Sequence, residues 1–156
     1  MTIIIPIFRL SGHRFNNFCF LIKQLKKIKV DILVCEQHSN LSVNIEKFLS
    51  QYKKVKYICE KTQFDYFNKS NIINLAFKTI DTKFGWVMDA DFYADYNYII
   101  NQVETNYNHM DFIRPFSEVV LLDKAETESL YSINKILLYN KEYQINSEDG
   151  KYSFIV

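Results

Sequence analysis

The apolar residues of this chain recur with two different periods, which predict strands and helices in alternation. Continuous apolar and β-branched runs predict buried strands at residues 2–8, 30–35, 55–59 and 85–88. Between these runs apolar residues recur at helical spacing, which predicts helices at residues 15–28, 41–52 and 71–80. The rest of the chain predicts a helix at 96–107, short strands at 112–113 and 119–122, a helix at 125–138, and a hairpin that pairs 143–145 with 152–156.

Repeated strand–helix units indicate the fold class. They predict an α/β fold with a mainly parallel, Rossmann-like sheet, right-handed crossovers and helices on both faces. The chain has 156 residues and no linker, repeat or low-complexity segment, so we expect one domain over residues 1–156. Ligands in such sheets bind beyond the carboxyl ends of the strands, so polar residues that follow each strand are the first candidates for a site.

Composition narrows the class of protein. Hydrophobic residues make up 48% of the chain and the formal net charge is +1, which fits a globular protein and gives no basis for binding nucleic acid. Only three glycines occur, so no glycine-rich phosphate loop is expected. Three cysteines without paired spacing predict free thiols in a reducing compartment. With no signal peptide and no apolar stretch of transmembrane length, we expect a cytoplasmic protein, and peripheral membrane attachment stays open.

Two aspartates, Asp89 and Asp91, follow the fourth apolar run directly. Two carboxylates one residue apart at the exit of a buried strand can share one hard cation, and such a cation can hold a nucleotide diphosphate. The motif is short enough to arise by chance, and aspartates in a solvated loop can instead cap the following helix. Their position after the strand favours the metal interpretation.

Residues after the first two strands would lie at the same edge of a parallel sheet as the aspartates. Glu36 and Gln37 could accept hydrogen bonds from a ribose hydroxyl or a base N–H. Phe8 could pack against a base, and Arg9 could pair with phosphate. The alternatives are surface polarity for Glu36 and a weak surface ion pair for Arg9.

A further candidate segment opens the helix that precedes the two aspartates. Lys69 would lie in the first turn of that helix, where the positive helix terminus also favours an anion such as a diphosphate. The alternative is a capped helix with Lys69 in solvent. The three histidines show no zinc-ligand spacing, and no nucleophile elbow is present.

Taken together and in order, four segments resemble the nucleotide-sugar half of a GT-A glycosyltransferase. The resemblance is to the family 2-like capsular polysaccharide enzymes and the β-1,4-galactosyltransferase group, and it covers roughly residues 2–122. The segments that carry it are residues 5–9 (IPIFR) with Arg14 downstream, 32–37 (ILVCEQ), 67–74 (FNKSNIIN) and 86–91 (WVMDAD).

The resemblance implies a role for each matching residue. Asp91 would ligate Mn²⁺ or Mg²⁺ bridging the diphosphate, and Asp89 would lie near the ribose or the metal. The resemblance also implies a nucleotide-sugar donor, with a UDP-sugar favoured, and a glycan acceptor. The remaining donor-binding residues would be those that line the nucleoside pocket or contact base and phosphates, namely Pro6, Phe8, Arg9, Arg14, Glu36, Gln37, Phe67 and Lys69.

The chain departs from the family after these segments. Relatives continue with a glycine-rich segment and an acidic Glu-Asp motif that bind the acceptor and supply the base. Glu148-Asp149 mimics that acidic pair without its context and is better explained as a hairpin turn. We therefore expect the donor half to be present and the acceptor half to be missing, as in a truncated or degenerate relative, and no catalytic residue is assigned.

Three functions stay open at this point. The first is a metal-dependent glycosyltransferase, or its donor-binding half, in glycan or polysaccharide biosynthesis. The second is a noncatalytic α/β module that binds a partner or self-associates through the edge where the missing half would dock. The third is a nucleotidyltransferase, against which the absence of a glycine-rich loop argues.

Overall fold

The computed structural model describes residues 1–38, 43–106, 109–114, 119–132 and 152–154. The chain forms two compact units, residues 1–91 and residues 92–156, where the sequence leads us to expect a single domain. Nothing in the composition around residue 91 marks this boundary, because no linker, proline or glycine cluster lies there.

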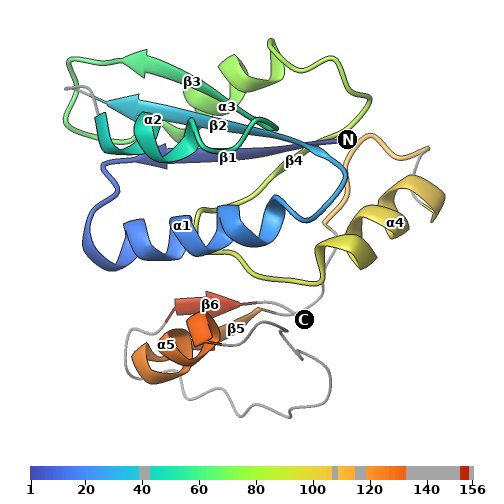
Figure 1. Ribbon diagram of the computed structural model, residues 1–156. Helices are drawn as coiled ribbons and strands as arrows, with labels where there is room; N and C mark the ends of the chain where they lie inside the picture. The colour runs from blue at the N-terminus through green and yellow to red at the C-terminus, as the bar shows by residue number, and fades with distance from the viewer. Residues whose placement is uncertain (39–42, 107–108, 115–118, 133–151, 155–156) are drawn as a thin grey trace. The chain divides into compact units, whose positions relative to one another are not determined.

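The first unit is an α/β layer structure built on a four-stranded parallel sheet (Figure 1). The strands lie in the order β3-β2-β1-β4, and every pairing between them is parallel. This confirms the predicted fold class, a parallel Rossmann-like sheet with flanking helices. Its elements in chain order are β1 (Thr2–Phe8), α1 (Gly12–Leu25), β2 (Asp31–His38), α2 (Val43–Leu49), β3 (Val55–Lys61), α3 (Lys69–Phe77) and β4 (Gly85–Val87).

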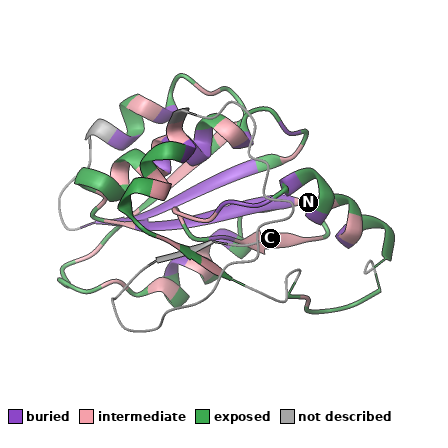
Figure 2. Ribbon diagram, turned by 90° about the horizontal axis from the view of Figure 1, so that it is seen from below, coloured by how far each residue is buried: buried purple, intermediate pink, exposed green. Residues whose placement is uncertain are grey.

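Alternation along the central strands sends apolar side chains to both faces of the sheet. On one face Ile4 and Leu33 form a core with Ile72 and Ala76 of α3. On the other face Ile3, Ile5 and Val34 are fully buried and lie under α1 and α2, which pack together where Phe48 contacts Phe15 and Phe18. Right-handed crossovers place α1 and α2 on one face of the sheet and α3 on the other. The chain adds β1, β2 and β3 in one direction across the sheet and then reverses direction to reach β4. Burial follows it: β1 and β2 are buried along nearly their whole length, whereas the helices expose their outer faces (Figure 2).

Pro6 explains where the pairing of β1 with β4 ends. The Thr2 N–H donates to the Phe84 carbonyl at 2.9 Å, and the Ile4 carbonyl accepts from the Met88 N–H at 2.9 Å, so the even-numbered residues of β1 turn their backbone groups toward β4. Pro6 is the next residue in this series and has no N–H to donate. The chain therefore leaves the sheet after Met88, and Asp89 and Asp91 emerge beside β1 without being paired to it.

The second unit contains α4 (Tyr96–Asn106), β5 (Val120–Leu122), α5 (Lys124–Ser132) and β6 (Tyr152–Phe154). β5 and β6 pair in antiparallel fashion. Asp123 and Glu126 form a reciprocal cap at the start of α5, where each carboxylate accepts a hydrogen bond from the other residue's backbone N–H at 2.9 Å. None of the helices in the described ranges is long and apolar enough to cross a membrane.

Several predicted elements differ in their bounds or partners. The short strand predicted at residues 112–113 is wrong, because that segment has no regular structure. Residues 143–145, the expected partner of the last strand, lie outside the described residues, as does Glu148-Asp149; β6 pairs with β5. β2 continues three residues beyond the predicted end at Cys35, and that extension changes the environment of Glu36 and Gln37.

Candidate functional site

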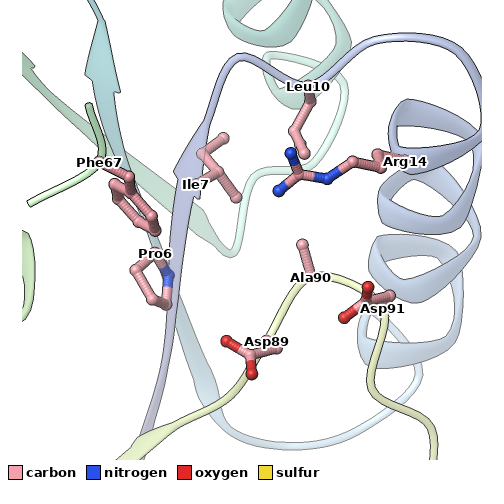
Figure 3. A pocket seen from close by; sticks show the side chains of 8 residues that line it. All are labelled: Pro6, Ile7, Leu10, Arg14, Phe67, Asp89, Ala90 and Asp91. Carbon is pink, nitrogen blue, oxygen red and sulfur yellow. The ribbon is translucent and has the colours of Figure 1, made fainter. Parts of the chain in front are cut away.

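A cavity of about 180 Å³ opens at the carboxyl edge of the first unit, between β1 and the segment that follows β4 (Figure 3). This is the topological switch point of the sheet, where consecutive connections run in opposite directions and ligands of open α/β sheets bind. It is smaller than the roughly 300–1,000 Å³ of pockets that enclose a whole drug-sized ligand. Its lining residues are Pro6, Ile7, Leu10, Arg14, Phe67, Asp89, Ala90 and Asp91.

Asp89 and Asp91 stand on the cavity wall opposite β1. Asp91 is half-buried, whereas the Asp89 side chain is 61% exposed. Partial burial raises the pKa of Asp91, and the nearby charge of Asp89 raises it further, while Arg14 and Lys69 oppose the shift. The site thus holds two carboxylates whose negative charges are disfavoured in each other's presence, a situation that a bound cation would relieve.

Two cationic side chains face these carboxylates from different helices. Lys69, the first residue of α3, forms an ion pair with Asp89 through its Nζ and the Oδ1 of the carboxylate. Arg14 reaches the cavity from the first turns of α1, and its guanidinium extends across the cavity toward Ile7 (Figure 3). The local structure places Lys69 here because the Asn68 side chain caps α3 by accepting from the Asn71 N–H at 3.1 Å.

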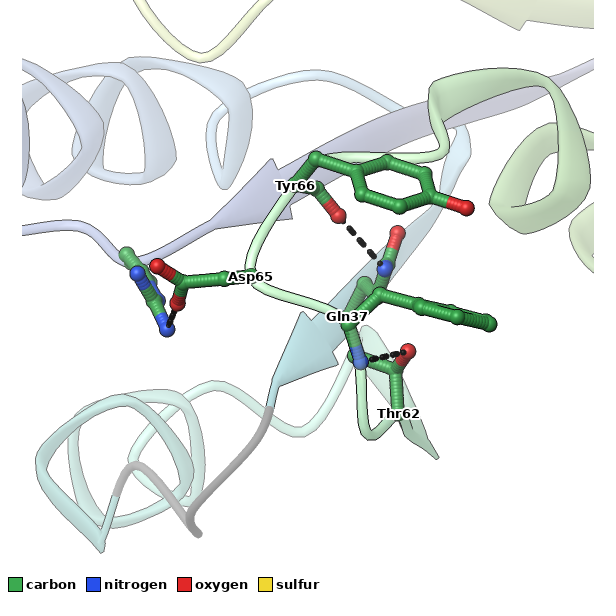
Figure 4. A network of polar contacts seen from close by, with 6 residues as sticks. Gln37, Thr62, Asp65 and Tyr66 are labelled. Carbon is green, nitrogen blue, oxygen red and sulfur yellow. Dashed lines mark hydrogen bonds and ion pairs between the residues drawn. The ribbon is translucent and has the colours of Figure 1, made fainter.

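Gln37 holds the loop that brings Phe67 and Lys69 to the cavity (Figure 4). Its Nε2 donates to the Tyr66 carbonyl at 3.0 Å, and its Oε1 accepts from the Asn68 N–H at 2.7 Å. Both ends of the amide are therefore engaged by the backbone on either side of Phe67. We predicted that Gln37 would hydrogen-bond a nucleoside; in the structure its contacts position the loop.

The end of β1 carries an aromatic and a strained residue. Phe8 stacks on Phe67, with ring centroids 5.5 Å apart and planes 2° from parallel. Arg9 follows with φ of 49°, a left-handed conformation that non-glycine residues seldom adopt. Its guanidinium pairs with Asp65 and lies 4.9 Å from the Phe8 ring centroid. Backbone strain of this kind clusters at functional sites, and here it occurs one residue after β1 ends.

Glu36 lies in a different environment from the one the sequence suggested. It belongs to β2 itself, is 1% exposed, and accepts a hydrogen bond from the Tyr57 hydroxyl on the neighbouring strand at 2.5 Å. Burial raises the pKa of Glu36, although the Tyr57 hydrogen bond and the nearby His38 oppose this. The alternative of surface polarity for Glu36 is wrong because β2 runs on to His38 and buries this side chain. The predicted contact with a nucleoside stays a prediction, and Glu36 is not among the residues that line the cavity.

The residues present fit a hard divalent cation in their chemistry. In the part of the chain that the structure describes, no group of three His, Cys, Asp or Glu side chains converges, and the acidic side chains that line the cavity are those of Asp89 and Asp91. Mg²⁺ commonly binds through one or two carboxylates, with substrate phosphates and water completing its ligands. A pair of carboxylates, which offers oxygen ligands alone, suits that arrangement.

The structure thus brings half of the sequence-predicted residues into one cavity, namely Pro6, Arg14, Phe67, Asp89 and Asp91. Phe8 and Lys69 touch members of this set, Gln37 positions it, and Arg9 and Glu36 lie beside it with other partners. Sequence reasoning missed Ile7, Leu10 and Ala90, which are apolar and carry no chemical signal of their own. Searches of protein-family models and of curated proteins gave no match to this chain, so the site's own geometry carries the functional argument.

Proposed function

We propose that the cavity binds the diphosphate of a nucleotide sugar together with Mn²⁺ or Mg²⁺, and that the chain is a metal-dependent glycosyltransferase or its donor-binding half. The observation that carries this proposal is the meeting of two carboxylates and two cations at the switch point of a parallel sheet. Such a combination suits a ligand that is itself a metal–anion pair, because the carboxylates hold the metal and the cations hold the phosphates.

Size and openness support a partial rather than an enclosing site. A cavity of about 180 Å³ has room for the diphosphate and its metal, with the nucleoside and sugar extending over the surrounding surface. The stacked pair Phe8 and Phe67 borders the cavity and offers an aromatic surface on the side where a base would extend. The small cavity is thus consistent with a larger ligand.

Each residue has a defined part in this proposal. Asp89 and Asp91 would hold the metal, which when bound stabilises the charge of the leaving nucleoside diphosphate. Lys69 and Arg14 would pair with phosphate oxygens. Gln37 keeps the Phe67–Lys69 segment in place through its two backbone hydrogen bonds. We assign no general base, and the acceptor is proposed only as a glycan.

Thermal unfolding of the chain with a panel of nucleoside diphosphates and nucleotide sugars, each with and without Mn²⁺, tests the proposal. Ligand at about 100 times its Kd should stabilise the protein by roughly 2.7 kcal/mol. The expected result is a shift that requires both metal and nucleotide, is largest with a uridine nucleotide, and disappears in Asp91→Ala.

Asp81→Ala is the matched control, because Asp81 is exposed and lies outside the cavity. It should leave the ligand-dependent shift intact. If no nucleotide shifts the unfolding of the folded wild-type chain, the donor-site proposal fails, and a noncatalytic α/β module becomes the better explanation. A shift that is equal in wild type and Asp91→Ala would place the nucleotide elsewhere.

A further inference from the structure

The near-neutral net charge of the chain conceals two oppositely charged units. Residues 1–91 contain 14 Lys and Arg against 8 Asp and Glu, a formal charge of +6. Residues 92–156 contain 5 Lys and Arg against 10 Asp and Glu, a formal charge of −5. The first unit is therefore strongly basic for its length, although the whole chain has a net charge of +1.

Much of this positive charge lies at one end of the first unit. Figure 1 shows that α1 and α2 both end at the edge where the strands of the sheet begin, opposite the cavity. Lysines are concentrated at these two helix ends, in the turns that follow them and at the start of β3. We call this set the amino-edge lysines: Lys23, Lys26, Lys27, Lys29, Lys53, Lys54 and Lys56.

The fold joins two lysine runs that are separate in the sequence. The Nζ of Lys26, at the end of α1, lies 5.7 Å from the ring centroid of Tyr52, which precedes Lys53 and Lys54. All seven amino-edge lysines are exposed. Read alone, residues 23–29 look like an ordinary solvated helix face, but the structure makes them half of a larger basic surface.

Local interactions leave most of this charge uncompensated. The carboxyl ends of α1 and α2 each carry a partial negative charge of about half an electron, which accounts for some preference for lysine there. Within the described residues none of the seven lysines forms an ion pair with a carboxylate, whereas Arg9 pairs with Asp65 and Lys69 with Asp89. Asp31, at the start of β2, is the nearest acidic residue along the chain to Lys29. Lys26 lies over the Tyr52 ring, Lys27 donates to the Gln24 side chain, and Lys56 lines a small cavity with Asp31 and Asp81. None of these contacts is an ion pair, so the seven exposed lysines leave a net positive charge at this edge.

We propose that the amino-edge lysines form a docking surface for an anionic lipid bilayer, with negatively charged headgroups as the ligand. Lysine is a compact, mobile point charge that suits diffuse attraction to a charged plane, and each lysine near such a surface contributes to binding additively. The surface contains no arginine. The planar guanidinium of arginine is the group that most often makes paired hydrogen bonds to phosphates and base edges in nucleic acids.

Two further features favour a lipid surface over nucleic acid. The exposed large hydrophobic side chains described in the first unit are Phe64, Tyr66 and Phe77, and none belongs to residues 23–29 or 53–56. A row of aromatic side chains among the lysines, which single-stranded nucleic acid would use for stacking, is therefore not found in these two segments. The carboxyl ends of α1 and α2 also lie at this surface, whereas specific phosphate sites form at the amino ends of helices. The surface therefore offers charge without specific phosphate sites.

Vesicle sedimentation of the full chain tests this proposal, which is independent of the proposed donor site. Binding should be strong to phosphatidylcholine vesicles that contain phosphatidylserine, absent with phosphatidylcholine alone, and lost as salt is raised toward about 1 M. Lys53→Gln/Lys54→Gln should weaken binding about 30-fold. Lys61→Gln/Lys124→Gln removes the same charge from residues outside this set and should change binding less than about threefold.

Circular dichroism of each variant establishes that it is folded, and surface lysine substitutions of this kind are expected to be near neutral for stability. The proposal is overturned if phosphatidylserine makes no difference, or if the two double variants weaken binding equally. Tighter binding to single-stranded RNA or duplex DNA than to anionic vesicles at the same salt would also overturn it and assign the surface to nucleic acid.

Discussion

The two edges of the parallel sheet use charge in opposite ways. At the carboxyl edge, acidic and basic side chains are interleaved around a cavity, where Lys69 pairs with Asp89 and Arg9 with Asp65. At the amino edge, seven lysines are exposed and none of them is ion-paired within the described residues. Both edges belong to the same 91-residue unit and are built from the ends of the same strands.

The difference follows from the backbone. Helix amino ends, strand exits and the early end of the β1–β4 ladder all fall at the carboxyl edge, so backbone groups and side chains converge on a hollow there. At the amino edge the helices end and the chain turns back into the sheet, and the exposed lysines there outnumber the acidic residues Asp31 and Asp81. Balanced charge around a hollow suits a small ligand, whereas an excess of one charge over an outer surface suits an extended one.

The largest expected effect on stability comes from removing the hydrogen bonds that hold the loop at the carboxyl edge. Gln37→Leu keeps the approximate size of a side chain that is 2% exposed but removes both hydrogen bonds to the loop around Phe67. Leaving the Tyr66 carbonyl and the Asn68 N–H unpaired should lower the free energy of unfolding by about 2 kcal/mol. Urea denaturation monitored by circular dichroism measures this, and nucleotide affinity should fall with it.

Gln24→Leu supplies the matched control from α1. Gln24 accepts one exposed hydrogen bond from Lys27 at 3.0 Å, and its replacement should change stability by no more than about 0.5 kcal/mol. Equal effects from the two substitutions would mean that the Gln37 hydrogen bonds do not anchor the loop.

The second prediction concerns the unfavourable charge of Asp91. Because the pKa of Asp91 is raised above its ordinary value of 3.8, the folded protein holds this proton more tightly than the unfolded chain. The contribution of Asp91 to stability therefore falls as the pH rises from below 3.8 through the raised pKa, and stays low above it. Asp91→Asn removes the charge and should stabilise the ligand-free protein at neutral pH by about 0.5–2 kcal/mol, while abolishing metal-dependent nucleotide binding.

The pH dependence separates this explanation from a general effect of the substitution. Below the ordinary pKa both side chains are neutral, so the stability difference between wild type and Asp91→Asn should disappear in acid. Asp81→Asn, with an exposed aspartate, should show a stability change within about 0.5 kcal/mol at either pH. A stabilisation by Asp91→Asn that persists unchanged in acid would contradict the electrostatic cause.

Most of the first unit could be predicted from its sequence because its strands are long apolar runs separated by helical periods. The four strands and the three helices between them are all present, with ends displaced by a few residues. The predicted end of β2 was three residues too early. The polar residues Glu36, Gln37 and His38 are typical of a loop, but Glu36 and Gln37 are buried in the strand. Strand propensity does not predict this burial, because it depends on hydrogen bonds to distant residues. The backbone of β2 pairs with β1 and β3, and the side chains of Glu36 and Gln37 hydrogen-bond to Tyr57 and to the loop at residues 66–68.

The candidate site was predictable in its charged members and not in its geometry. Asp89, Asp91 and Lys69 carry chemistry that can be recognised one residue at a time. The role of Pro6 in ending the β1–β4 ladder depends on which strand faces its missing N–H, and that follows only from the sheet order. The joining of two lysine runs through Lys26 and Tyr52 is likewise a property of the fold. Contacts between distant segments are what the single sequence lacks.

A smaller effect is expected at the strained exit of β1. Arg9 has φ of 49°, which costs an L-residue roughly 1–2 kcal/mol and costs glycine almost nothing. Arg9→Ala keeps the strain and loses the Asp65 and Phe8 contacts, so it should destabilise the protein by about 1 kcal/mol. Arg9→Gly loses the same contacts but relieves the strain, and should match wild type within about 0.5 kcal/mol in urea denaturation. A glycine variant less stable than the alanine variant would show that residue 9 does not need a left-handed conformation in solution.

The smallest expected effect concerns the competition between Lys69 and a metal for Asp89. In the ligand-free structure the Lys69 ammonium already neutralises the carboxylate that a cation would use, so metal binding must displace it. Lys69→Gln should therefore tighten Mn²⁺ binding in the absence of nucleotide by about 1.4- to 5-fold, the range expected for an exposed ion pair. The same variant should weaken binding of a nucleoside diphosphate in the presence of Mn²⁺, because a phosphate partner is lost. Isothermal titration measures both, and Lys56→Gln at the amino edge should change neither. Opposite signs for metal and nucleotide would mean that Lys69 exchanges one partner for the other on binding, whereas weakening of both would mean that Lys69 only holds Asp89 in place.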